Sequence, residues 1–167
     1  MGNSNDDLQA LVADLTCTDV IKCQNARRRL VQIGESAVKC LEEALLDKNH
    51  WVHWEAAKAL AEIGSPTATK ALIQALEHRE FDQRWIAAEG LTSIGRPALI
   101  PLLERLIDRP QSLWLQQSAH HVMSDTKSDE LHQIVGPVIE AIEGPEPSVE
   151  VPLTARKAIE ILRQGTP

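Results

Sequence analysis

Aromatic side chains are scarce in this sequence of 167 residues, which contains four Trp, one Phe and no Tyr. Hydrophobic residues still make up 43% of the chain, so aliphatic side chains, mainly Ala and Leu, must build the core. Such a core is typical of closely packed helices. One domain is expected, because a chain of about 150 residues already buries roughly 70% of the surface that it exposes when unfolded.

Positive charge is also in short supply, since 17 Lys and Arg stand against 24 Asp and Glu, for a net charge of −7. Proteins that bind nucleic acid neutralise phosphates with a surplus of Lys and Arg. The one dense basic run is 27–29, which we interpret as a solvated helix face that pairs with nearby acidic residues. The composition therefore argues against a nucleic-acid partner and favours a basic one.

The sequence has neither paired cysteines nor a long apolar run. Cys17, Cys23 and Cys40 are an odd number without CxxC spacing, so we expect no disulfide framework and no zinc motif, but reduced thiols packed as small hydrophobic groups. No segment approaches the ~18 apolar residues of a membrane-spanning helix, and the first ten residues lack a basic stretch followed by an apolar one. We therefore expect a soluble cytoplasmic protein with no membrane partner.

An internal repeat is the main signal in the sequence. Three similar segments of 22 residues begin at Ala26, Ala56 and Ala87, and their Ile-Gly pairs recur at 33–34, 63–64 and 94–95, a period of 30 to 31 residues. Each unit predicts two helices. A Gly with positive φ ends the first helix, and Pro66 or Pro97 begins the second in the units from Ala56 and Ala87.

The repeat pattern predicts one all-α domain, a superhelical solenoid over 1–167. Residues 1–17 form an N-terminal capping helix, 18–50, 51–80, 81–110 and 111–143 form repeats, and 144–167 form a linker and a C-terminal half repeat. The fourth repeat is degenerate: Ala119 and Val122 keep its first-helix pattern, Asp125 to Glu130 is an insertion, and Pro137 begins the second-helix pattern. Because one helix pair cannot bury its apolar face alone, stacking of the units creates the core.

Two of the repeats resemble a known family. The stretches VHWEAAKALAEIGSPTATKALIQAL from Val52 and QRWIAAEGLTSIGRPALIPLLERL from Gln83 are similar to the HEAT-like repeats first described in phycobilisome lyases. The resemblance covers roughly Ala26 to Ile142 and implies an armadillo-type superhelix whose second helices line a concave face. The family includes pigment lyase subunits, hydroxylases and adaptors, so it leaves the function open.

The residues do not support an enzyme. Hydroxylases of this family hold iron with adjacent His-Glu pairs, and the sequence contains no such dipeptide; Glu55 projects about 200° around the helix from His53. No other histidines have a ligand spacing typical of a metal site. We expect no catalytic residue, metal or cofactor, and we interpret His53 and Arg84 as structural hydrogen-bonding groups between neighbouring repeats.

The outward positions of the second helices predict a binding strip. Glu43, Gln74, Glu104 and Glu140 occupy equivalent sites and would form an acidic stripe. The other predicted partner-binding residues are Glu77, Ile100, Ile107, Asp108 and, on a first helix, Trp51. Leu46 lies beside the stripe, Trp54 and Trp85 are expected to pack between repeats, and Trp114 is expected in the core.

These observations predict a non-enzymatic scaffold that binds a basic or amphipathic segment of a partner protein through its concave face. Two alternatives stay open. The acidic stripe is merely solvated, or the protein is an accessory subunit in the attachment or removal of a bilin chromophore, as the resemblance to phycobilisome lyases implies.

Overall fold

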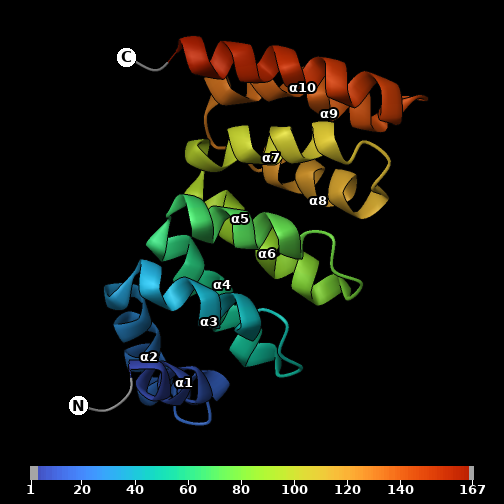
Figure 1. Ribbon diagram of the computed structural model, residues 1–167. Coiled ribbons are helices and arrows are strands. Elements are labelled where there is room, and N and C mark those ends of the chain that lie inside the picture. The colour runs from blue at the N-terminus through green and yellow to red at the C-terminus, as the bar shows by residue number, and fades with distance from the viewer. Residues whose placement is uncertain (1–3, 166–167) are drawn as a thin grey trace.

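The structure, a computed structural model that describes residues 4–165, is a stack of helices (Figure 1). The helices are α1 (Ser4–Ala13), the short 3-10 helix η1 (Asp14–Thr16), α2 (Val20–Ile33), α3 (Glu35–Ala44), α4 (His50–Ile63), α5 (Pro66–Ala75), α6 (Phe81–Ile94), α7 (Arg96–Asp108), α8 (Leu113–Ser124), α9 (Asp129–Glu143) and α10 (Pro147–Gln164). Within the described range there is no strand, which confirms the all-α prediction.

Polar residues placed before the helices determine where several of them begin. The Asp19 carboxylate accepts hydrogen bonds from the backbone N–H groups of Ile21 and Lys22, at 3.0 and 3.2 Å. The side chains of Asn49, Ser65, Ser112 and Ser128 cap α4, α5, α8 and α9 in the same manner. These caps satisfy N–H groups that have no partner inside a helix.

Glycines with positive φ join the two helices of the first three units, as the sequence predicts. Gly64 is left-handed, with φ 59° and ψ 14°. Gly34 and Gly95 have φ 69° and 72° with ψ near −135°, a region that is open almost only to glycine. Each glycine turns the chain within about one residue, so that α2 pairs with α3, α4 with α5 and α6 with α7.

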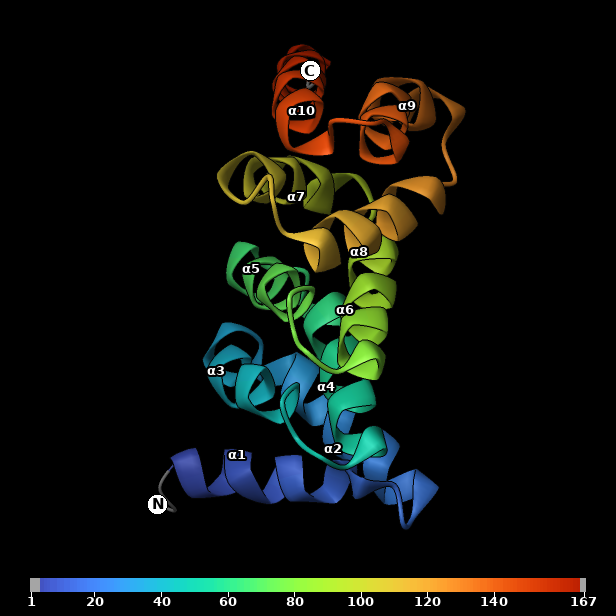
Figure 2. The same ribbon diagram turned by 90° about the vertical axis from the view of Figure 1, so that its right-hand side faces the viewer.

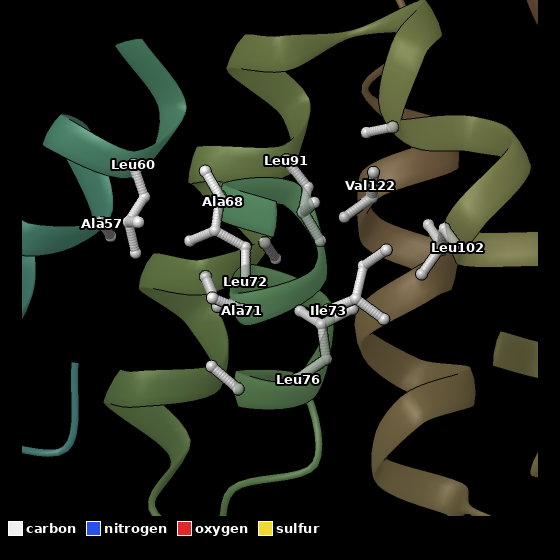
Figure 3. Close-up of a cluster of buried hydrophobic side chains, with 14 of the residues drawn as sticks. Ala57, Leu60, Ala68, Ala71, Leu72, Ile73, Leu76, Leu91, Leu102 and Val122 are labelled. Carbon is white, nitrogen blue, oxygen red and sulfur yellow. The ribbon is translucent and has the colours of Figure 1, made fainter. Parts of the chain in front are cut away.

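The paired helices form two rows, with α2, α4, α6 and α8 in one and α3, α5 and α7 in the other (Figure 2). The core lies between the rows, where Leu30, Leu60 and Leu91 recur at the repeat period and are fully buried. Figure 3 shows Leu60, Leu72 and Leu91 in one cluster of buried side chains. The repeat therefore buries the same aliphatic positions again and again, without aromatic residues.

The fourth unit has helices that pack against each other, α8 and α9, but its arrangement differs from that of the first three units. Helix α10, expected to be a separate half repeat, packs against α7 and thus continues the row of second helices, while α9 lies over α8 (Figure 2). The connection 125–128 has no glycine, and Asp125 has φ −82°, so the chain is not turned back toward α7. Helix α10 instead packs against α7, and its residues Ala155, Ile159 and Leu162 are buried.

The cysteine prediction is wrong for two of the three residues. Cys17 and Cys23 form a disulfide, because left-handed backbone at Cys17 (φ 53°) turns the chain between η1 and α2 and brings the two Cα atoms to 4.9 Å. Cys40 is a free buried thiol, as expected, and burial raises its pKa. Across residues 4–165 no helix has both the length and the apolar character needed to span a membrane.

Candidate interaction surfaces

The predicted acidic stripe is only partly assembled. Glu43 on α3, Gln74 on α5 and Glu104 on α7 are exposed on the row of second helices. Glu140 is also exposed but lies on α9, outside that row, because α10 has taken the place beside α7. The expectation of a four-residue stripe is therefore wrong at its last position.

Two of the predicted acidic residues, Glu77 and Glu104, are engaged in ion pairs. Glu77 follows α5 with only 13% of its side chain exposed, and it accepts hydrogen bonds from Arg105 Nε and Nη2 at 2.9 and 2.5 Å. Arg109 lies 3.4 Å from its other oxygen. Glu104 pairs with Arg163 of α10 at 3.0 Å. These carboxylates tie helices together, so less negative charge is free to meet a partner than the sequence suggests.

The other predicted residues of this face divide into anchors and exposed groups. Ile100 and Ile107 are half-buried and pack against the core, whereas Asp108 is exposed at the end of α7. A shallow pocket of about 210 Å³ lies between α3 and α5, where Gln74 and the exposed Leu46 contribute to the lining. An apolar anchor beside the stripe is therefore available at Leu46.

A second surface, of which the sequence analysis predicted only Trp51 as a binding residue, contains the aromatic residues of the first helices. Trp51 and Trp54 lie on α4, Phe81 and Trp85 on α6, and Trp114 on α8. We call these five residues the aromatic surface. Four of them are largely exposed, at 53% for Trp51, 63% for Phe81, 43% for Trp85 and 45% for Trp114, while Trp54 packs partly against the core as expected.

The prediction that Trp114 lies in the core is wrong because the fourth unit is aligned one residue too early. The buried positions of α8 are Leu115, Ala119, Val122 and Met123, which repeat the spacing of Val52, Ala56, Ala59 and Leu60 on α4. Leu115 therefore takes the core place, and Trp114, one residue or 100° earlier on the helix, projects from it. The periodicity of the apolar residues along α8 is therefore enough to predict that Trp114 lies outside the core.

The correct register also explains His53 and Arg84. His53 Nδ1 lies 3.1 Å from the Asp47 carbonyl oxygen, and Arg84 Nη1 donates to the carbonyl oxygens of His78 and Arg79 at 2.8 and 2.9 Å. At the equivalent place on α8, Gln116 Nε2 donates to Pro110 at 2.6 Å. In all three repeats this side chain ties down the loop six residues before it, which confirms the structural interpretation.

Polar groups from the protein itself stack on the rings of the aromatic surface. Lys58 Nζ lies 5.3 Å from the centre of the Trp54 ring, and the His121 ring stacks on Trp85 at 4.3 Å. The Arg84 guanidinium lies between two rings, 5.7 Å from that of Phe81 and 5.1 Å from that of Trp114. These contacts hold the rings in place on neighbouring helices.

One further cluster has the composition of a metal site. Glu89, His121 and Asp125 bring their ligand atoms within 4.8 Å of one another, and His121 Nε2 is 2.9 Å from Glu89 Oε1. The residues come from α6, α8 and the following loop, so their spacing in sequence shows no motif. Here His121 pairs with Glu89 and stacks on Trp85, which are both ordinary helix-to-helix contacts.

Comparison with known families supports the repeat architecture. Residues 8–83 match the family model of HEAT repeats. This part of the chain is similar to HEAT repeats. The matched range spans α1 to the start of α6, and the same helix pairing continues in α6 and α7 beyond it. No curated protein matches the chain. The phycobilisome-lyase subtype stays a prediction.

Proposed function

We propose that this protein is a non-enzymatic scaffold that binds a partner polypeptide through the aromatic surface of α4, α6 and α8. HEAT repeats generally mediate interactions between proteins, and they are typically not enzymes. Stacked repeats offer long continuous surfaces for that purpose. A scaffold of this kind needs a recognition surface rather than a catalytic constellation.

The observation that carries this proposal is where the aromatic residues lie. The chain has only five Trp and Phe residues, and all are on first helices. Four of them have exposed fractions between 43% and 63%, although burial would be favourable for such large apolar side chains. Exposed contiguous apolar surface marks interaction sites, and Trp is enriched among the residues that dominate binding energy. The net charge of −7 favours a basic segment as the partner and would accelerate its association.

The partly assembled acidic stripe on the second helices supports a rival location for the same function. Glu43 and Gln74 take no part in the ion pairs described above, and Gln74 lines the pocket at Leu46. A basic helix could lie there, steered by charge. The two faces belong to different rows of helices, so substitutions can test them separately.

Affinity capture from a lysate of the source cells tests the proposal with three forms of the tagged protein. The wild type is compared with Trp51→Ser/Phe81→Ser/Trp114→Ser on the aromatic surface and with Glu43→Lys/Gln74→Lys on the stripe. All substituted positions are exposed, so unchanged helical circular dichroism is expected for both variants.

We expect one polypeptide to be retained by the wild type and the stripe variant and lost by the aromatic variant. Loss by the stripe variant alone would move the site to the second helices, and equal retention by all three would overturn both locations. The visible spectrum of the eluate tests the alternative function, since a bound pigment would favour a role in bilin attachment or removal.

A further inference from the structure

A pocket between α4 and α6 is bordered by two pairs of rings. His50 and Trp54 from α4 have ring centres 6.1 Å apart and planes 25° apart, and Phe81 and Trp85 from α6 have centres 6.1 Å apart and planes 31° apart. With Asp82 and Ile86 these four residues line a pocket of about 310 Å³, which we call the aromatic pocket. Its volume lies at the lower end of the range for small-molecule sites.

Three of the groups that stack on these rings lie outside the aromatic pocket, whereas His50, which stacks on Trp54, lines it. Lys58, Arg84 and His121 cover Trp54, Phe81 and Trp85 respectively, and none of the three lines the pocket. Lys58 instead lines a neighbouring pocket that shares Trp54 and Ile86 with the aromatic pocket. Lys58, Arg84 and His121 therefore do not fill the aromatic pocket, which has room for a ligand.

The aromatic pocket has the electrostatic character of a site for a cation that does not donate hydrogen bonds. The face of an aromatic ring is negative, and it attracts cations within about 6 Å. Among the residues that the structure describes, Asp82 is the one carboxylate that lines the pocket, and no Lys or Arg lines it. The walls offer few hydrogen-bond acceptors, so an ordinary ammonium group would lose hydration there without replacement. A quaternary ammonium group carries no N–H and loses much less.

We propose that the aromatic pocket binds the side chain of a trimethylated lysine in the partner polypeptide, an inference that rests on the proposed function. The exposed Phe81 and Trp85 form part of both the pocket and the wider aromatic surface. A segment lying on that surface can therefore insert one side chain between α4 and α6. The pocket supplies specificity for the methylated cation, and the surrounding rings supply apolar contact.

The test uses the purified chain and three small probes: the acetylated amide of trimethyl-lysine, its neutral isostere with carbon in place of the quaternary nitrogen, and the same amide of unmodified lysine. Binding is followed by the indole N–H signals of the four Trp residues. We expect the signals of Trp54 and Trp85 to shift with trimethyl-lysine, and the neutral isostere to bind about tenfold more weakly. Unmodified lysine should bind more weakly still.

Two variants and a control distinguish the contributions of ring and charge. Trp85→Leu should abolish binding of trimethyl-lysine while helical circular dichroism is preserved. Asp82→Asn, at an exposed position, should weaken that probe several-fold and leave the isostere unchanged. Leu153→Ala is the control, because Leu153 is exposed on α10 and belongs to neither the aromatic surface nor the aromatic pocket; this variant should bind the probe as the wild type does.

Equal affinity for the cation and its neutral isostere would overturn the proposal, as would the absence of binding by trimethyl-lysine. Binding to phosphatidylcholine vesicles without binding to trimethyl-lysine would also overturn it and assign the pocket to a lipid headgroup. None of these results touches the scaffold function, which is tested separately by capture of a polypeptide on the aromatic surface. If the wild type captured no polypeptide but still bound trimethyl-lysine, the scaffold function would be overturned and the assignment of the aromatic pocket would stand.

Discussion

Removing one partner of the ion pair between Arg27 and Glu55 should strongly destabilise the first two repeats. Arg27 projects from α2 and Glu55 from α4, with Arg27 Nε 2.7 Å from Glu55 Oε2, and the exposed fraction of Glu55 is only 7%. The N–H of that nitrogen makes no hydrogen bond, so the contact is ionic. Arg27 also pairs with Glu62. The substitution Arg27→Met keeps the aliphatic volume and leaves Glu55 without its main counter-charge.

The structure sets the size of the effect. Breaking a buried ion pair costs about 3–5 kcal/mol. Lys58 Nζ, 3.4 Å from Glu55, keeps some compensation, which reduces the expected loss to about 2–3 kcal/mol. For a chain of this size the corresponding fall in Tm is about 4–12 °C. Thermal and urea unfolding followed by circular dichroism measure it, with coincident transitions checked because repeat arrays can unfold in steps.

The double variant Arg27→Met/Glu55→Ile tests the reasoning further. Ile86 occupies the place of Glu55 in the next repeat, so isoleucine suits this position. With both charges removed, we expect stability within about 1 kcal/mol of the wild type. The exposed neighbour Arg28→Met is the control and should change stability by less than about 0.5 kcal/mol. A double variant no more stable than Arg27→Met would refute the idea that an unpaired buried carboxylate causes the loss.

Three other predictions concern the backbone, the disulfide and a histidine. Gly95→Ala should cost about 1–3 kcal/mol in urea unfolding, because its φ and ψ are nearly restricted to glycine, whereas Gly64→Asn in left-handed backbone should cost less than about 1 kcal/mol. Reducing the disulfide of Cys17 and Cys23 should lower stability by about 2 kcal/mol, given the short loop it closes, and Cys17→Ser should abolish the effect of reductant. Burial lowers the pKa of His78 below 6.5, so its NMR titration should have a midpoint under that value; its contribution to stability is complete above pH 6.5 and is lost as the pH falls. A midpoint at or above 6.5 would show that burial does not control this group.

Local patterns in the sequence were enough to determine the architecture of the first three units. The recurring Leu30, Leu60 and Leu91 set the buried face, and the glycines before α3, α5 and α7 set the turns, because both effects act within a few residues. The structural role of His53 and Arg84 follows from the same local periodicity, since each reaches a carbonyl oxygen six residues earlier.

Only the tertiary structure decided which faces are available for binding. Ion pairs such as Glu77 with Arg105 join residues 28 apart, so a helical wheel of one element cannot show that the carboxylate is already neutralised. The place of α10 beside α7 depended on a connection after α8 that lacks the glycine turn, and it removed Glu140 from the predicted stripe. The aromatic surface likewise arises because three first helices stack side by side, which brings residues from separate repeats onto one face.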